Sequence, residues 1–189
     1  MPHIHTEPGQ FDQTASAFIF RTDFDEPKII LHMHRKLNKY LQFGGHVELN
    51  EHPWQTLERE LREESGYDFS QLKLLQPDLP QIKHADYRGA AAHPLPFTYG
   101  SYQFATTDHI HTDSAYAFIT DQEPKNKPDE GESLNIPMFS RQEIEDLQAP
   151  EQIPTNVKTI ILFAFNNILN HWKATDPHDF QVEPIKVDA

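Results

Sequence analysis

Residues 44–68 read GGHVELNEHPWQTLERELREESGYD, a glycine-rich turn followed by a short acidic segment. Pro53 suits the first turn of a helix, where its missing N–H is not needed, and Gly66 suits a position just after a helix end. The apolar residues of the segment recur at the helical period and form one stripe: Trp54, Leu57 and Leu61. The sequence therefore predicts a helix over residues 53–65 with one face packed against a core.

Three glutamates lie beside this apolar stripe. On a helical projection Glu60 and Glu64 fall within about 60° of Leu57, whereas Glu63 falls about 120° from it. Carboxylates beside buried side chains lose hydration and repel one another unless a positive charge lies between them. Helical ion pairs such as Arg59 with Glu63 are an alternative explanation, but they leave the like-charged pair unexplained. Oxygen ligands suit Mg²⁺ or Mn²⁺, so the pattern favours a divalent metal site.

The composition is typical of one globular domain. The chain has 189 residues, 37% hydrophobic and 24% charged, with a net charge of −13. Because no basic surface is evident, we expect no stable nucleic-acid binding. The absence of cysteine excludes disulfides, thiolate zinc sites and a cysteine nucleophile. The first residues show no signal-peptide pattern, and the longest apolar run, 160–165, is too short to span a bilayer. We therefore expect a cytoplasmic protein with no membrane partner.

Strands precede and follow the acidic helix. The strands that we expect cover residues 15–21, 28–34, 40–47, 81–87, 97–106, 115–120 and 134–139. The first two would form a hairpin. Residues 69–80 contain two prolines and are expected to be an irregular connection, and residues 121–133 a polar loop. Ser140 and Glu143 form a capping-box pattern that begins a helix, and Pro154 begins the last long helix.

This order of elements favours a single α+β domain with a mixed sheet and helices on both sides. We expect the domain to cover residues 14–172, between a lead-in at 1–13 and a polar tail at 173–189. The sequence shows no internal repeat and no linker between two domains.

The spacing within residues 45–67 resembles the Nudix box, the signature of the Nudix hydrolases. The residues at its fixed positions are Gly45, Glu51, Arg59, Glu60, Leu61, Glu63, Glu64 and Gly66. Tyr67 stands where the family usually has Ile, Leu or Val, a position whose role is packing. The phrase before the box, HRKLNKYLQFGGHVE, is similar to a bacterial Nudix subgroup with Gly-Gly-His. The resemblance implies an α/β/α sandwich with a mixed central sheet, a catalytic loop and helix, and a long C-terminal helix.

The resemblance also implies an activity and a set of roles. It implies metal-dependent hydrolysis of a nucleoside diphosphate linked to another group X, by attack of water at phosphorus. The acids Glu60, Glu63 and Glu64 and the carbonyl of Gly44 would hold Mg²⁺ or Mn²⁺. Arg59 would orient the acids, and Glu51 would be a supporting charge in the same unit.

Further candidates are less specific. Glu132, with Glu130 beside it, is the candidate for a loop acid that takes a proton, and an ordinary surface loop is the alternative. Residues that could line a base or X pocket, or could instead be core, are Arg35, Phe43, Tyr99, Tyr116 and Phe139. His109 and His111 could share one strand face as metal ligands, or could simply begin a strand.

Two other functions fit the same family. A catalytically silent Nudix domain could sense a nucleotide or bind a partner, although the intact acids argue against it. Isomerisation of an isoprenoid diphosphate is disfavoured, because the relatives that catalyse it use a cysteine. Relatives are often dimers, so a homodimer is a further expectation.

Overall fold

Two long parallel strands form the centre of the fold. In the computed structural model, which describes residues 9–78, 93–103 and 110–180, β1 (Phe11–Arg21) runs beside β8 (Ile110–Thr120). The two strands are paired along their whole length, from Phe11 opposite Ile110 to Arg21 opposite Thr120. Their side chains are buried on both faces, as expected for strands covered from both sides.

Antiparallel strands extend this pair on both sides. β1 also pairs with β2 (Lys28–Ile30) and β5 (Phe43–His46), and β8 with β6 (Lys73–Gln76) and β7 (Thr98–Tyr102). The edges are β9 (Met138–Phe139) next to β2 and β10 (Lys173–Thr175) next to β6. A separate two-stranded sheet joins β3 (His32–His34) to β4 (Lys39–Leu41). The main sheet is therefore mixed, as the sequence predicted.

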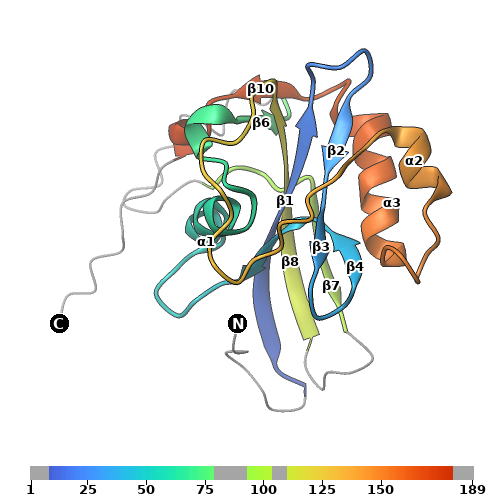
Figure 1. Cartoon of the computed structure of the whole chain (residues 1–189). Coiled ribbons are helices and arrows are strands. Elements are labelled where there is room, and N and C mark those ends of the chain that lie inside the picture. Colours follow the sequence, from blue (N-terminus) through green and yellow to red (C-terminus); the bar gives the residue numbers. More distant parts are fainter. Residues whose placement is uncertain (1–8, 79–92, 104–109, 181–189) are drawn as a thin grey trace.

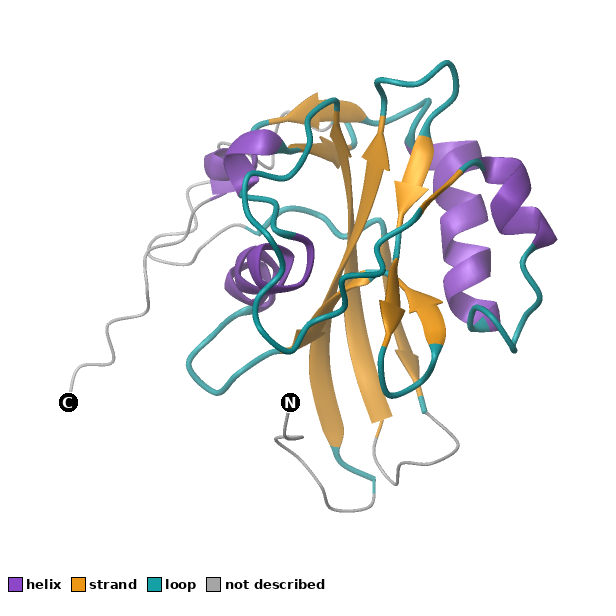
Figure 2. Cartoon of the chain, viewed as in Figure 1, coloured by secondary structure: helices purple, strands orange, loops and turns teal. Residues whose placement is uncertain are grey.

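Helices lie on both sides of the sheet (Figures 1 and 2). On one side α1 (Pro53–Glu60) continues as a π-helix over Leu61–Ser65. On the other lie α2 (Arg141–Asp146) and α3 (Thr155–Phe163), the latter continuing as a π-helix over Ala164–Ile168. Short 3₁₀ helices cover Phe69–Gln71 and Pro177–Phe180. This arrangement is the predicted α/β/α sandwich. Among the described residues, no helix combines the length and apolarity needed to cross a membrane.

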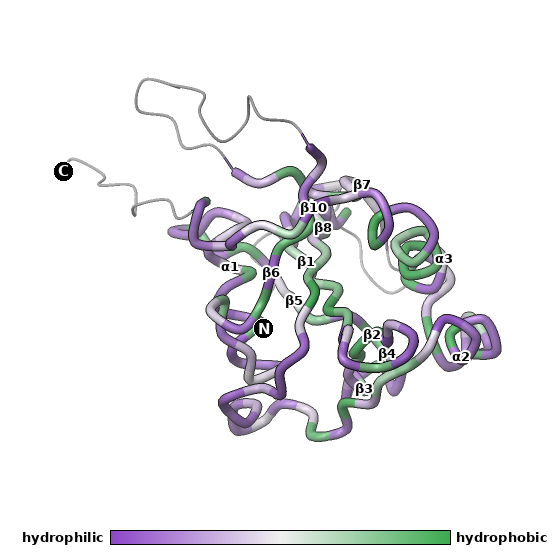
Figure 3. The backbone as a smooth tube through the Cα atoms, turned by 90° about the horizontal axis from the view of Figure 1, so that it is seen from above, coloured by the Kyte–Doolittle hydropathy of each residue, from purple (hydrophilic) through white to green (hydrophobic). Residues whose placement is uncertain are grey.

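The core has two halves, one on each face of the sheet. Ala15, Ala17 and Ile19 of β1 belong to the half under α1, and Phe18 and Phe20 belong to the half under α3. This division follows from the alternation of side chains along a strand. Figure 3 shows hydrophobic residues gathered along the central strands, with hydrophilic ones towards the periphery.

Trp54 is the centre of the half under α1. Its ring is 98% buried and lies 4.8 Å from the Phe69 ring, 5.3 Å from the Tyr116 ring and 6.3 Å from the Phe180 ring, between centroids. Leu57 and Leu61 are fully buried beside it. The apolar stripe predicted for this helix is confirmed.

Several predicted elements differ in extent. The hairpin of β1 and β2 is confirmed, but β1 begins at Phe11, inside the expected lead-in. The strand expected at 28–34 is interrupted at Leu31, and the one at 40–47 at Gln42. The capping box of Ser140 and Glu143 is present. The strand expected at 134–139 is limited to Met138–Phe139, and the one at 81–87 lies outside the described residues.

Two expectations about connections were wrong. Residues 69–80 were expected to be irregular, yet they contain β6, which pairs with both β8 and β10. The polar tail expected from residue 173 instead forms β10 and a 3₁₀ turn that ends in buried Phe180. Both strands are short and are held in the sheet by pairing with strands far away in sequence.

Candidate active site

Local sequence fixes both ends of α1. His52 caps the helix, because its side chain accepts a hydrogen bond from the Gln55 amide and the Gln55 side chain accepts one from the His52 amide. At the other end Gly66 adopts a left-handed conformation with φ of 75°. A Cβ at Gly66 would overlap the Asn126 carbonyl, so glycine lets the following loop approach the helix closely.

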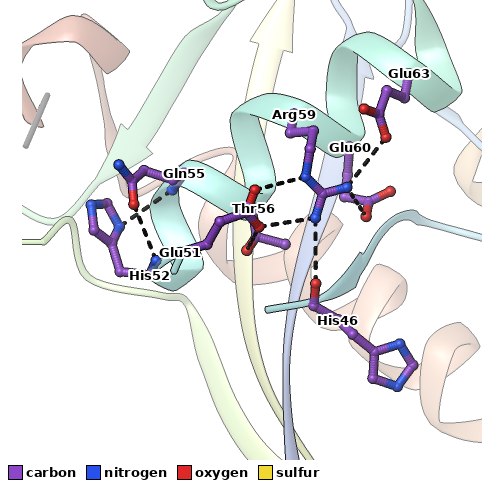
Figure 4. Close-up of polar contacts among 8 residues, drawn as sticks. All are labelled: His46, Glu51, His52, Gln55, Thr56, Arg59, Glu60 and Glu63. Carbon is purple, nitrogen blue, oxygen red and sulfur yellow. Dashed lines mark hydrogen bonds and ion pairs between the residues drawn. The ribbon is translucent and has the colours of Figure 1, made fainter. Parts of the chain in front are cut away.

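Arg59 is the centre of a polar cluster on this helix (Figure 4). Its Nε and Nη2 donate to the two carboxylate oxygens of Glu51 at 2.8 and 2.9 Å, a bidentate arrangement. Its Nη1 donates to Glu60 at 2.6 Å and to Glu63 at 3.2 Å, and its Nη2 to the His46 carbonyl at 3.4 Å. One guanidinium therefore connects the loop before α1 with two of the box acids.

Glu64 is held by the backbone of strand β5. The Gly44 amide donates to Oε2 of Glu64 at 2.8 Å, and Gly44 has a φ of 135°. A Cβ at this position would overlap the Ala15 carbonyl. Only glycine therefore brings the β5 backbone this close to both β1 and the helix acid.

Burial raises the pKa of two box acids. Glu60 is 2% exposed, and burial raises its pKa to about 7, although the neighbouring Arg59 acts in the opposite direction. Burial likewise raises the pKa of Glu64 well above its usual value, opposed by the hydrogen bond from Gly44. The side chain of Glu63 is 29% exposed. Two carboxylates are thus held where their charge is poorly solvated.

The predicted loop acid Glu132 lies close enough to act on these two carboxylates, because its charge contributes to raising the pKa of both Glu60 and Glu64. Two backbone hydrogen bonds tie its loop to the end of the helical segment, from the Asp129 amide to the Glu63 carbonyl at 2.7 Å and from the Asn126 amide to the Gly66 carbonyl at 3.1 Å. Glu130, the alternative acid, is exposed.

Arg35 holds the same loop from its other side. Its Nη1 donates to the Gly131 carbonyl at 2.6 Å, next to Glu132. Arg35 was expected to line a pocket. In the structure its guanidinium anchors the loop that carries the candidate acid, and its role in a pocket stays a prediction.

The aromatic residues proposed for a pocket differ in how far they are buried. Phe43 and Tyr116 were expected as pocket residues, but they are buried in the core half under α1, which corrects that expectation. Both are strand residues whose side chains point towards α1, a direction that depends on register. Phe139 packs on Tyr40 with ring centroids 4.9 Å apart, and Tyr99 is 67% exposed.

His32 is a neighbour of the site that sequence reasoning missed. Its Nδ1 lies 3.9 Å from Oε1 of Glu64, and its ring lies against Phe43. Burial lowers the pKa of His32 to about 4, so the ring is neutral at neutral pH and the contact is not an ion pair. His32 follows an interrupted strand, and only strand pairing brings it to the helix acid.

The structure brings His111 next to His46, whereas the sequence suggested a pair of His109 and His111. His109 lies outside the described residues. His111 is buried in β8, with its Nε2 3.1 Å from Nε2 of His46, a residue distant in sequence.

Comparison with known proteins places the chain in a family. The family model of the NUDIX domain matches residues 12–160. This match covers most of the chain and includes the complete box. The chain therefore belongs to the Nudix family, and its enzyme class is Nudix pyrophosphohydrolase. No protein of curated function matches the sequence.

Solved structures share the fold. A hydrolase of the NUDIX family from Clostridium perfringens is 29% identical, with a TM-score of 0.66 over 82% of this chain and 95% of that one. The Ap4A hydrolase of C. elegans is 13% identical, with a TM-score of 0.56 over 80% and 94%. The NUDIX domain of Shewanella oneidensis NrtR, in complex with ADP ribose, is 12% identical, with a TM-score of 0.57 over 84% and 88%.

Proposed function

We propose that this protein hydrolyses the diphosphate bond of a nucleoside diphosphate linked to another group X, with Mg²⁺ or Mn²⁺ as cofactor. The observation that carries the proposal is the pair of buried carboxylates, Glu60 and Glu64, held by Arg59 and the Gly44 amide. Burying two like charges is costly unless a cation balances them.

The donor set fits a hard divalent cation. Carboxylate oxygens are the ligands that Mg²⁺ and Mn²⁺ prefer, and burial, which raises the pKa values of Glu60 and Glu64, makes their charged forms costly without a bound cation. Glu60, Glu63 and Glu64, with the Gly44 carbonyl, would hold the ion. When bound, the ion would neutralise the diphosphate and lower the pKa of a water molecule.

The residues of the chain perform the remaining tasks. Arg59 keeps Glu60 and Glu63 at fixed positions, and Glu51 in turn fixes Arg59 through two hydrogen bonds. Glu132 accepts the proton of the attacking water, because it is the carboxylate of the opposing loop. Arg35 keeps Glu132 near the helix by holding the adjacent Gly131 carbonyl.

The substrate class is supported by the ligands of proteins with the same fold. The C. elegans structure is of an Ap4A hydrolase, and the Shewanella structure holds ADP ribose. Both compounds contain a nucleoside joined to a chain of at least two phosphates. A nucleoside diphosphate derivative is therefore the class to test first.

The test is a screen of purified protein against nucleoside diphosphate sugars, dinucleoside polyphosphates and nucleoside triphosphates. Each compound is incubated with Mg²⁺, Mn²⁺ or EDTA, and phosphate is measured after treatment of the products with phosphatase. We expect turnover of one class, abolished by EDTA. Nucleotide binding by calorimetry without any turnover across the panel would instead favour the catalytically silent sensor.

A further inference from the structure

A second group of possible metal ligands lies on the other face of the sheet. Asp12 of β1, His46 of β5 and His111 of β8 each offer one ligand atom, and these atoms all lie within 4.8 Å of one another. Two of the side chains are buried and one is partly exposed: Asp12 is 1% and His111 2% exposed, and the side chain of His46 is 17% exposed.

Strand register explains why the three side chains meet. Asp12 and His111 are direct partners across the parallel pair of β1 and β8, so their side chains stand side by side on one face. His46 of β5 is the partner of Thr14 of β1. Thr14 is two residues after Asp12 on the same strand, so the side chains of Asp12, Thr14 and His46 share one face of the sheet. No local pattern in the sequence places these residues together.

This group is separate from the box acids. The His46 carbonyl accepts a hydrogen bond from Arg59, whereas its imidazole points away from α1 (Figure 4). Phe43, three residues earlier in β5, packs on the α1 side, so alternation places the His46 ring on the opposite face. The two sites therefore use opposite faces of the same strand.

The geometry fits ligands that share one ion. Ligands bound to a metal at about 2.0–2.1 Å lie about 2.8–3.0 Å apart at octahedral angles and about 3.3–3.4 Å apart at tetrahedral angles. The Nε2 atoms of His46 and His111 are 3.1 Å apart, and Oδ2 of Asp12 is 3.8 Å from Nε2 of His46. A small rotation of the Asp12 side chain would complete the set.

The surroundings favour a cation. Asp113, two residues after His111 on the same face, is a second buried carboxylate, and its Oδ1 accepts hydrogen bonds from Thr14 at 2.8 Å and Ser16 at 2.9 Å. The Tyr102 ring stacks on the His111 ring with centroids 5.4 Å apart and holds the imidazole plane in place. The partial exposure of His46 leaves a route from solvent.

We propose that Asp12, His46 and His111 bind a divalent transition-metal ion such as Zn²⁺, independently of the ion at the box acids. Imidazole nitrogen selects such ions, whereas Mg²⁺ prefers oxygen. Bound there, the ion joins the ends of three strands. It also fixes β5 at the residue whose carbonyl holds Arg59, and so connects the second site mechanically to the box.

The test uses the full-length protein, freed of metal by chelation and then titrated with Zn²⁺ and Co²⁺. Calorimetry in the presence of saturating Mg²⁺ measures Zn²⁺ binding, and the absorption spectrum of the Co²⁺ form reports nitrogen ligands. We expect Asp12→Asn and His46→Gln to weaken Zn²⁺ binding at least tenfold, since even outer-shell changes cost about 10–100-fold. The control Glu64→Gln should leave this Zn²⁺ binding unchanged.

A second measurement avoids dependence on variants that could fold poorly. In ¹⁵N-labelled parent protein, Zn²⁺ should shift the Nε2 resonances of His46 and His111 and leave that of exposed His171 in place. Zn²⁺ binding that is equal in parent and Asp12→Asn, or histidine resonances that do not respond to Zn²⁺, would overturn the proposal. Neither result bears on turnover at the box acids, so the two proposals fail separately.

Discussion

The amide of Gly44 donates a hydrogen bond of 2.8 Å to the carboxylate of Glu64, twenty positions later in the chain. This contact joins strand β5 to the end of the helical segment. It also makes the position of the acid depend on a backbone conformation that only glycine adopts easily, with φ of 135°. The glycine of β5 and the acid therefore form one structural unit.

Replacing Glu64 by Gln should lower kcat by about 10²-fold or more, because the change removes a ligand charge without changing volume. The fold should be retained, as judged by circular dichroism. The control is Glu58→Gln, an exposed acid on the same helix, which should have parent-like turnover. Similar losses in both variants would refute the assignment of the ligands.

Glu132→Gln should lower kcat by about 10²–10⁴-fold, because the proton acceptor is lost. It should also remove the fall in rate at acidic pH that protonation of this carboxylate causes in the parent. The matched control is Glu130→Gln, two residues earlier in the same loop but exposed. If the Glu130 variant is impaired and the Glu132 variant is not, the base is assigned to the wrong residue.

The contribution of Glu60 to the stability of the metal-free protein should become more favourable as pH falls. Glu60 has a pKa of about 7 in the folded state, against an ordinary value of 4.5, so the folded state binds the proton more tightly. The cost of burying its charge is complete above about pH 8 and is relieved as pH falls to about 5. Melting temperatures in EDTA across this range provide the measurement.

Glu60→Gln should remove that contribution and raise the melting temperature at pH about 8, since the buried charge is gone. Mg²⁺ should stabilise the parent more at pH about 8 than at pH about 6, because protons compete with the ion for the carboxylates. A difference in melting temperature between the parent and Glu60→Gln that stays constant from pH 8 to pH 5 in EDTA would contradict the assignment of a raised pKa.

Gly44→Ala should destabilise the fold by about 1–3 kcal/mol or more, because its φ is unfavourable for alanine and the new Cβ would overlap the Ala15 carbonyl. Gly100→Ala is the control: nothing lies within 4 Å of a Cβ there, so its effect should stay within about 0.5 kcal/mol. Urea unfolding of the two variants measures the difference, and equal midpoints would argue against the close approach of β5 to β1.

The sequence alone determined the family, the class of fold and the helix that carries the acids. Helical spacing depends only on residues close together in the sequence. The spacing of Trp54, Leu57 and Leu61 therefore predicted the apolar face of the helix, and the same spacing predicted that Glu60 and Glu64 lie at the edge of that face. The capping pattern at Ser140 likewise depends on residues within one turn.

Only the tertiary structure decided which distant residues meet. Strand register determines that the side chains of Phe43 and Tyr116 lie in the core and that His32 lies next to Glu64. It also places Asp12, His46 and His111 on one face of the sheet. Register is set by pairing between strands far apart in sequence, and a shift of one residue would turn each side chain to the other face. A local pattern records the period of a strand but not its partner, and for that reason the box was predicted from sequence and the second cluster was not.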